Sequence, residues 1–168
     1  MPVIESKIMI NSESFKKNQE DHQKLIDEIR TLEQKIADNS ARSKAKFDKR
    51  GQLLPRERLK RLLDPGSFWL PLSTLAGYKI GDDDGDKNIG WGNSISGIGY
   101  VAGVRCMIGV SDAGIKGGSA SAMGTEKALR GAQIIFENKL PFIQLIESAG
   151  ANLLRPVSYT HLRAHETV

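Results

Sequence analysis

The hydrophobic positions at the start of the chain follow a helical period. In residues 15–37, Leu25, Ile29, Leu32 and Ile36 recur at intervals of four, three and four residues, with charged residues on the other faces. This pattern predicts one long amphipathic helix, which Asn39 and Ser40 then stop or kink. A membrane-surface helix would have bulkier apolar residues and fewer acids, so we expect the stripe to pack against the body of the protein or a partner subunit.

A second, shorter helix is predicted at Pro55. Proline is favoured in the first turn of a helix, and apolar residues continue to Leu62 and Leu63 before the sequence Asp64-Pro65-Gly66 ends the pattern. Residues 67–70 then form a short extended piece.

From Ile95 onwards the pattern changes to that of strands. Residues 95–100 and 104–110 flank Ala102-Gly103 and predict an antiparallel hairpin. Residues 123–139 predict a helix whose apolar face consists of Ala128, Leu129, Ala132, Ile135 and Phe136. Residues 141–150, PFIQLIESAG, read as a buried strand that ends in a loop of small residues. The order strand, strand, helix, strand predicts an α/β fold.

Composition and charge narrow the class of protein. The chain has 168 residues, 39% of them hydrophobic, and lacks an apolar run long enough to cross a bilayer, so we expect no membrane role. Its start resembles neither a secretory signal nor a transit peptide, and the single Cys106 allows no internal disulfide; both features predict a cytoplasmic protein. Nine basic residues between Arg42 and Arg61 indicate either a polyanionic partner or a solvated helix face.

Metal and side-chain catalysis are poorly supported. Asp82, Asp84 and Asp86 alternate as in a calcium loop, but Lys87 and Asn93 stand where such a loop needs Gly and Glu. His161 and His165 have metal-ligand spacing without an obvious third ligand. Ser148 lacks a nearby base and the glycines of a nucleophile elbow. We therefore expect no bound metal and no serine triad.

Two loops of small residues at strand ends are the better candidates. One is Ser148-Ala149-Gly150, and the other is Lys116-Gly117-Gly118-Ser119. Small residues let a ligand approach backbone N–H groups, which stabilise a developing oxyanion such as a thioester enolate. A plain strand-to-helix turn and a phosphate-binding loop are the alternatives, although neither loop has a Walker or Gly-x-Gly-x-x-Gly pattern.

Three segments carry a resemblance to a known family. Residues Leu53–Phe68, Ser96–Ser119 and Glu137–Leu154 resemble, in the right order, the start of the carboxyltransferase (beta) subunit of biotin-dependent acyl-CoA carboxylases, the group of propionyl-, methylcrotonyl- and geranyl-CoA carboxylases. The resemblance implies a crotonase-like α/β fold of repeated strand-strand-helix units, incomplete here and preceded by a long amino-terminal helix.

The resemblance also implies a reaction and its partners. In the family, CO2 passes from carboxybiotin, carried by the biotin carboxylase/biotin carrier (alpha) subunit, to the α-carbon of an acyl-CoA. The biotin nitrogen takes the α-proton, so a protein base is not needed. Other beta subunits are expected partners, whereas nucleic acid and membrane are not. A CoA-ester decarboxylase of the same superfamily, or a non-catalytic anion-binding fragment, are the alternative functions.

The site residues follow from the same resemblance. The family's Ser-Gly-Gly loop, which supplies N–H groups to the enolate, falls on Ser148-Ala149-Gly150, with Ala in place of the commoner first Gly. Its Gly-Gly-Ser loop, which lies along CoA, falls on Gly117-Gly118-Ser119, with Lys116 near the phosphates. Arg56 and Arg58 match an Arg-Glu-Arg motif that we interpret as structural, holding the helical extension by salt bridges.

The family subunit is several times longer than this chain. We expect a helical extension in residues 1–64 and the first part of the amino-terminal carboxyltransferase domain in residues 65–155. Residues 156–168, PVSYTHLRAHETV, depart from the family pattern and resemble a translated sequencing-adapter sequence, so we expect them to be unrelated to function. The chain alone is expected to be inactive, and the resemblance leaves the acyl group open.

Overall fold

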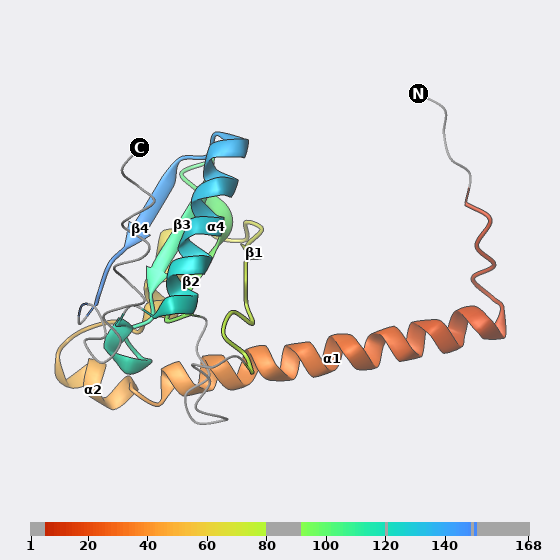
Figure 1. Ribbon diagram of the computed structural model, residues 1–168, viewed down its shortest axis with the longest axis horizontal. Helices are drawn as coiled ribbons and strands as arrows, with labels where there is room; N and C mark the ends of the chain where they lie inside the picture. The colour runs from red at the N-terminus through yellow and green to blue at the C-terminus, as the bar shows by residue number, and fades with distance from the viewer. Residues whose placement is uncertain (1–5, 80–91, 120, 149, 151–168) are drawn as a thin grey trace. The chain divides into compact units, whose positions relative to one another are not determined.

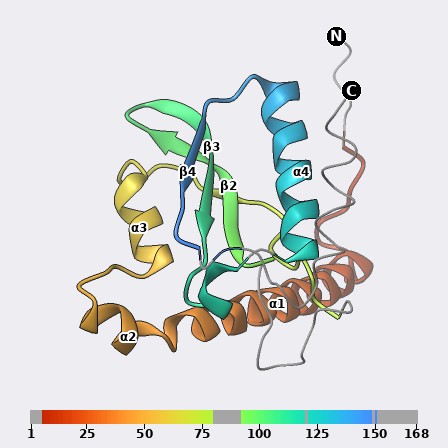
Figure 2. The ribbon, with the colours of Figure 1, turned by 60° about the vertical axis from the view of Figure 1, so that its left-hand side comes forward.

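The computed structural model describes residues 6–79, 92–119, 121–148 and 150. The chain divides into two compact units, residues 1–34 and 35–168. Figure 1 labels the strands and helices α1, α2 and α4, and Figure 2 also labels α3. In chain order they are α1 (Glu13–Ala41), α2 (Lys44–Lys49), α3 (Pro55–Leu62), β1 (Leu70–Pro71), β2 (Ser94–Val101), β3 (Val104–Ser111), η2 (Lys116–Gly118), α4 (Ala122–Asn138) and β4 (Phe142–Leu145).

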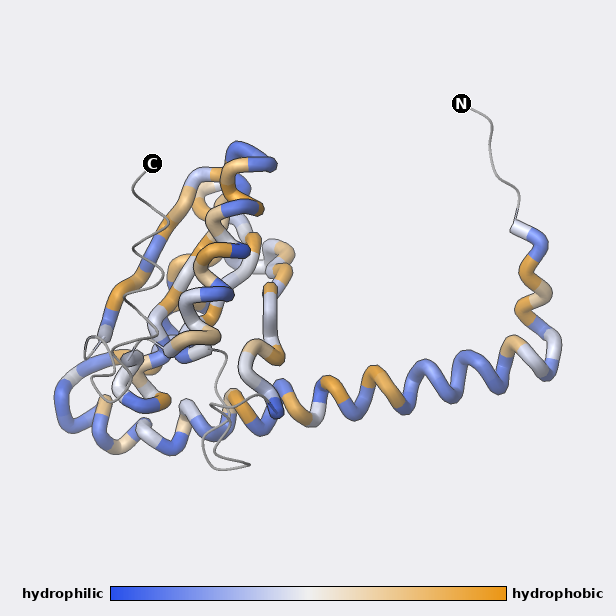
Figure 3. The backbone as a smooth tube through the Cα atoms, viewed as in Figure 1, coloured by the Kyte–Doolittle hydropathy of each residue, from blue (hydrophilic) through white to orange (hydrophobic). Residues whose placement is uncertain are grey.

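The first unit contains the amino-terminal turns of α1. Figure 3 shows hydrophobic positions recurring between hydrophilic ones along this helix, as the sequence predicted. Leu25, Ile26 and Ile29 are exposed in the structure. The predicted apolar stripe is therefore buried only at its far end, at Ile36, which belongs to the second unit.

Helix α1 ends at Ala41, one residue beyond the predicted stop at Asn39 and Ser40. Ser40 is buried, and its hydroxyl donates to Asp112 Oδ1 over 2.6 Å. Its side chain therefore makes a tertiary hydrogen bond instead of competing for the helix backbone. Ile36 packs one turn earlier against Ile115, with Leu75 and Tyr78 beside them.

The second unit is built on a four-stranded sheet in the order β1-β2-β3-β4. β2 and β3 form the predicted antiparallel hairpin, which turns at Ala102 (φ 50°) and Gly103 (φ 76°). These positive φ values match the twist of the strands and suit a two-residue turn. β4 pairs with β3 in parallel, and α4 makes the crossover between them.

Two helices cover the sheet from opposite sides, as Figure 2 shows for α3 and α4. On the α3 side, Leu59 packs with the strand residues Ile95, Cys106, Ile108 and Val110. Gly97 and Gly99 belong to the same face, and a side chain at either position would overlap the Trp69 indole. These glycines therefore let Trp69 lie directly on β2.

The predicted apolar face of α4 is confirmed in part, because Ala128, Ala132 and Ile135 line the pocket between the helix and the sheet. The most deeply buried positions of the helix are different ones. Lys127 and Gly131 are its buried residues, whereas Leu129 is 45% exposed and Phe136 is 85% exposed. A Cβ on Gly131 would lie 3.2 Å from Met107 Cε, so the helix approaches β3 closely at this glycine. These buried positions are a glycine and a lysine, and hydrophobic periodicity therefore does not predict them.

β4 is not the buried strand that the sequence predicted. Its residues alternate between exposed and half-buried, and Phe142 is 49% exposed. The reason is its place in the topology: among the described residues β4 pairs only with β3, so it forms an edge of the sheet. An edge strand with apolar residues is normally covered by further chain or by a partner.

Candidate functional site

The parallel pairing of β3 and β4 brings their carboxyl ends to the same edge of the sheet. The chain leaves β3 at Ser111 and β4 at Leu145, and each strand is followed by one of the small-residue loops. We call residues 115–119 the glycine loop and residues 146–148 with 150 the serine loop. This edge is where ligands bind in open α/β sheets.

The glycine loop is held in a left-handed conformation over three consecutive residues. Lys116, Gly117 and Gly118 have φ values of 47°, 65° and 68°. The turn is closed by hydrogen bonds from Gly118 N to Ile115 O (2.9 Å) and from Ser119 N to Lys116 O (3.3 Å). Lys116 is exposed and Gly118 is buried, so the lysine faces solvent from a loop fixed underneath.

A hydrogen bond from Ser148 joins the two loops. Its hydroxyl donates to the carbonyl oxygen of Gly118 over 2.8 Å. The Ser148 hydroxyl oxygen in turn accepts a hydrogen bond from Gly150 N at 3.1 Å, and Gly150 is exposed with a φ of 97°. In this state the Gly150 N–H is therefore bound to a hydroxyl oxygen of its own loop.

The backbones of the two loops are in close contact as well. A Cβ on Gly118 would lie 2.5 Å from the carbonyl oxygen of Glu147. Any side chain at position 118 would push the loops apart, and the positive φ adds strain for residues other than glycine.

The serine loop is also connected to α3. Arg58 Nη1 donates to Glu147 Oε2 over 3.1 Å, and each of these side chains is 26% exposed. In the motif Arg56-Glu57-Arg58, the expected structural salt bridge is made by Arg58, and Glu57 accepts a hydrogen bond from Leu54 N at the start of α3.

Buried charges lie beneath the glycine loop. Asp112 is fully buried, where its Oδ1 accepts hydrogen bonds from the Ser40 hydroxyl (2.6 Å) and from Gly114 N (3.2 Å). Burial raises the pKa of the Asp112 carboxyl, and the hydrogen bond from Ser40 opposes this shift. Arg56 and Lys127 contribute opposite charge.

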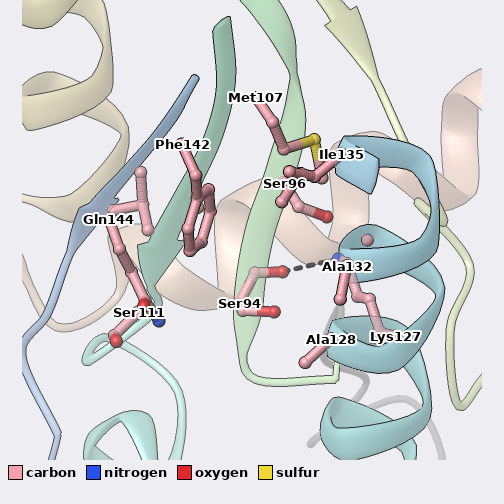
Figure 4. A pocket seen from close by; sticks show the side chains of 13 residues that line it. Ser94, Ser96, Met107, Ser111, Lys127, Ala128, Ala132, Ile135, Phe142 and Gln144 are labelled. Atoms are coloured by element: carbon pink, nitrogen blue, oxygen red, sulfur yellow. Dashed lines mark hydrogen bonds between the residues drawn. The ribbon is translucent and has the colours of Figure 1, made fainter. Parts of the chain in front are cut away.

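Lys127 is the buried cation of α4. Its ammonium group donates to the Ser94 carbonyl oxygen over 2.7 Å, and burial lowers the pKa of Lys127 to about 7. Figure 4 shows this bond at one side of a pocket between α4 and the sheet, with Met107, Phe142 and Gln144 on the strands opposite. The pocket has a volume of about 310 Å³.

The structure brings together most of the residues predicted for the site. Gly117, Gly118, Ser119, Ser148 and Gly150 lie in the two contacting loops, whereas Ala149 lies outside the described residues. The acidic loop with Asp82, Asp84 and Asp86 and the pair His161 and His165 also lie outside them. Within the described ranges, no three His, Cys, Asp or Glu side chains are grouped to hold a metal.

Sequence reasoning missed four contributors to this edge of the sheet. They are Asp112 and Lys127, Glu147 as the partner of Arg58, and Asn93, whose side-chain amide donates to Ser119 O over 2.6 Å. Each acts across a contact between segments distant in sequence, for which the local pattern gives no signal.

A β3-α4-β4 crossover with two contacting small-residue loops at one sheet edge defines an α/β protein with a backbone-lined site. The Carboxyl transferase domain family matches residues 46–160 of the chain. The chain belongs to this family.

Individual relatives agree with the family assignment. The chain is 36% identical over 154 residues to a probable mitochondrial methylcrotonoyl-CoA carboxylase beta chain of Drosophila melanogaster, covering 91% of this chain and 26% of that protein. It is 41% identical over 137 residues to a biotin-dependent 3-methylcrotonyl-coenzyme A carboxylase beta1 subunit of Mycobacterium tuberculosis, covering 81% and 25%.

A solved structure supports the fold. The beta subunit of geranyl-CoA carboxylase from P. aeruginosa matches with a TM-score of 0.85 and 47% identity, over 98% of this chain and 30% of that one. The prediction of a crotonase-like α/β fold in a carboxyltransferase subunit is confirmed. The chain spans about a quarter of the length of the curated relatives it matches.

No helix among the described residues is long and apolar enough to cross a bilayer. Cytoplasmic location stays a prediction, and so do the domain boundaries at residues 64 and 155. Part of the basic stretch is neutralised within the chain, since Lys44 pairs with Asp48 and Arg58 with Glu147. This reduces the charge available to an anionic macromolecule.

Proposed function

We propose that the chain provides the acyl-CoA-binding loops of the carboxyltransferase component of a biotin-dependent acyl-CoA carboxylase. The observation that carries the proposal is the Ser148–Gly118 hydrogen bond, which joins the two predicted loops at one edge of the sheet. Membership of the carboxyl transferase family supports the same assignment. The reaction transfers CO2 to the α-carbon of an acyl-CoA through its enolate.

In this proposal, the glycine loop binds CoA and the serine loop binds the thioester. Gly117, Gly118 and Ser119 lie along the ligand, and the exposed Lys116 lies near its phosphates. The thioester oxygen replaces the Ser148 hydroxyl as the acceptor of the Gly150 N–H, with Ala149 as the neighbouring donor. A single oxyanion donor is worth on the order of 2.7–4 kcal/mol in the transition state.

Carboxybiotin supplies the CO2 group when an alpha subunit presents it. We assign none of the described residues to biotin, because in this proposal both loops bind the acyl-CoA. Binding of the alpha subunit and assembly with other beta subunits are part of the proposal for the whole protein.

The proposal is tested by infrared spectroscopy of propionyl-CoA labelled with 13C at its carbonyl carbon. On binding to the chain, the carbonyl stretch is expected to move to lower wavenumber, because N–H donors polarise the bond. Free CoA serves as the binding control. A bound thioester whose carbonyl stretch matches that in water would contradict the proposed oxyanion site.

A matched pair of variants isolates the N–H group. Gly150→Pro removes the donor, whereas Gly150→Ala keeps it, and both residues are strained at a φ of 97°. No atom of the described residues lies within 4 Å of a Cβ built on Gly150, so neither change collides with them. Only the proline variant is expected to lose most of the carbonyl shift.

A further inference from the structure

Helix α3 is anchored firmly beside the serine loop. Leu59 is buried in the core, so the middle of the helix is fixed against the sheet. Just beyond its carboxyl end, the Asp64 carboxylate accepts hydrogen bonds from Ala102 N (2.7 Å) and Gly103 N (2.8 Å) of the hairpin turn. A side chain on α3 is therefore presented from a rigid support, which is what precise positioning of a site requires.

Arg58 uses this support to hold a residue 89 positions later in the chain. Its guanidinium binds the Glu147 carboxylate, while the carbonyl oxygen of Glu147 lies 2.5 Å from the position that a Cβ on Gly118 would take. Glu147 is thus held through its side chain on one side and its backbone on the other. Ser148, the next residue, makes the hydrogen bond that joins the loops.

The ion pair is partly open to water. A pocket of about 340 Å³ lies beside it, lined by Gln52, Leu53, Arg58, Ile146 and Glu147. Loss of one partner therefore leaves a charge that water can reach, not one sealed in the interior, and the fold is expected to tolerate it. The consequence of the pair is local: it fixes where the serine loop leaves β4.

We propose that Arg58 is a positioning residue for the acyl-CoA site, acting through Glu147 to set the orientation of Ser148 and of the Gly150 N–H. This inference rests on the proposed function. In this proposal Arg58 acts through Glu147 and not on the ligand directly, because its guanidinium is paired with the Glu147 carboxylate.

The test uses the full chain with Arg58→Met, Glu147→Gln and the charge-reversed double variant R58E/E147R. Lys60→Met, at an exposed position of the same helix, is the matched control. Circular dichroism establishes that each variant is folded. Amide hydrogen exchange at Gly150 is measured without ligand, and the 13C carbonyl stretch of bound propionyl-CoA is measured with it.

Arg58→Met and Glu147→Gln are expected to speed exchange at Gly150 by about fivefold, as loss of a partly exposed ion pair allows. They should also lose at least half of the carbonyl shift, while the affinity for free CoA stays at the wild-type value. R58E/E147R should recover most of the shift, and Lys60→Met should match the wild type.

The outcomes separate the two proposals. If the Arg58→Met variant keeps the wild-type carbonyl shift and the wild-type exchange rate at Gly150, the positioning role is wrong and the proposed function stands. A wild-type complex without any carbonyl shift would remove the proposed function and this inference with it. If Arg58→Met fails to fold, Arg58→Lys and Glu147→Gln give the same two readouts.

Discussion

The carbonyl oxygen of Glu147 lies where the side chain of any residue but glycine at position 118 would have to go. Gly118 also has a φ of 68°, so the glycine loop depends on this residue both for its conformation and for its contact with the serine loop. The arrangement makes position 118 the most sensitive point of the proposed site.

Gly118→Ala is expected to lower stability and to weaken acyl-CoA binding. The left-handed conformation costs an alanine roughly 1–2 kcal/mol, and the overlap with Glu147 adds roughly 1–3 kcal/mol. Gly103→Ala is the matched control, because its φ is 76° and an added Cβ has no atom within 4 Å in the part of the chain that the structure describes. Urea unfolding of both variants measures the difference; equal losses would show that the Glu147 contact contributes nothing.

Ser148→Ala is expected to uncouple the two loops. The change removes a donor to the Gly118 carbonyl and the acceptor of the Gly150 N–H, together worth about 1–3 kcal/mol of local stability. Exchange of the Gly150 amide should become faster. Ser96→Ala, whose hydroxyl makes only a long 3.4 Å bond to Leu72 O, is the control. Unchanged exchange at Gly150 would mean that the Ser148 hydroxyl does not order the loop.

Lys116→Gln is expected to weaken CoA binding mainly at low salt. Lys116 is exposed on the glycine loop, so its attraction to phosphates is screened as ionic strength rises. Lys139→Gln is a close control, because Lys139 is also an exposed lysine with a positive φ, 50° against 47°, at the opposite end of α4. Calorimetric titration with CoA at two salt concentrations checks this; equal effects of both variants would exclude a phosphate role for Lys116.

Lys127 is expected to make stability rise with pH above neutrality. Its pKa is lowered from 10.5 to about 7 in the folded chain, so between these values the unfolded chain binds the extra proton and stability increases with pH. Deprotonation of Lys127 should raise the free energy of unfolding by roughly 1 kcal/mol per pH unit in this range. Asp112 acts in the opposite sense at lower pH, because its raised pKa makes the folded chain bind the proton first.

Lys127→Met tests this slope by urea unfolding at pH 7, 8 and 9. The variant keeps the length of the side chain but lacks the titrating group, so the increase of stability with pH should disappear. It also removes the donor to the Ser94 carbonyl, which lowers stability at every pH. Lys139→Met, an exposed lysine at the end of the same helix, should keep the wild-type slope. If the free energy of unfolding of Lys127→Met rises with pH as steeply as that of the wild type, another group is responsible for the pH dependence.

The hydrophobic pattern predicted the elements with local signals. Pro55 marks the start of α3, and Ala102-Gly103 mark the hairpin turn, because the backbone preferences of these residues act within a few positions. The same patterns did not predict which polar and small residues make contacts between elements distant in sequence. Ser40 donates to Asp112 from the last turn of α1, and the fully buried residues of α4 are Lys127 and Gly131 and not its large apolar residues.

The sequence by itself determined the order of strands and helices, the two small-residue loops and the family, because each is encoded in contiguous residues. Only the tertiary structure decided that β4 pairs in parallel with β3 at an edge of the sheet, and that Ser148 bonds to Gly118 and Arg58 to Glu147. These contacts join residues 30 and 89 positions apart. They form because the packing of α3 and α4 on the sheet brings the ends of two strands together. A local sequence pattern contains no information about this packing.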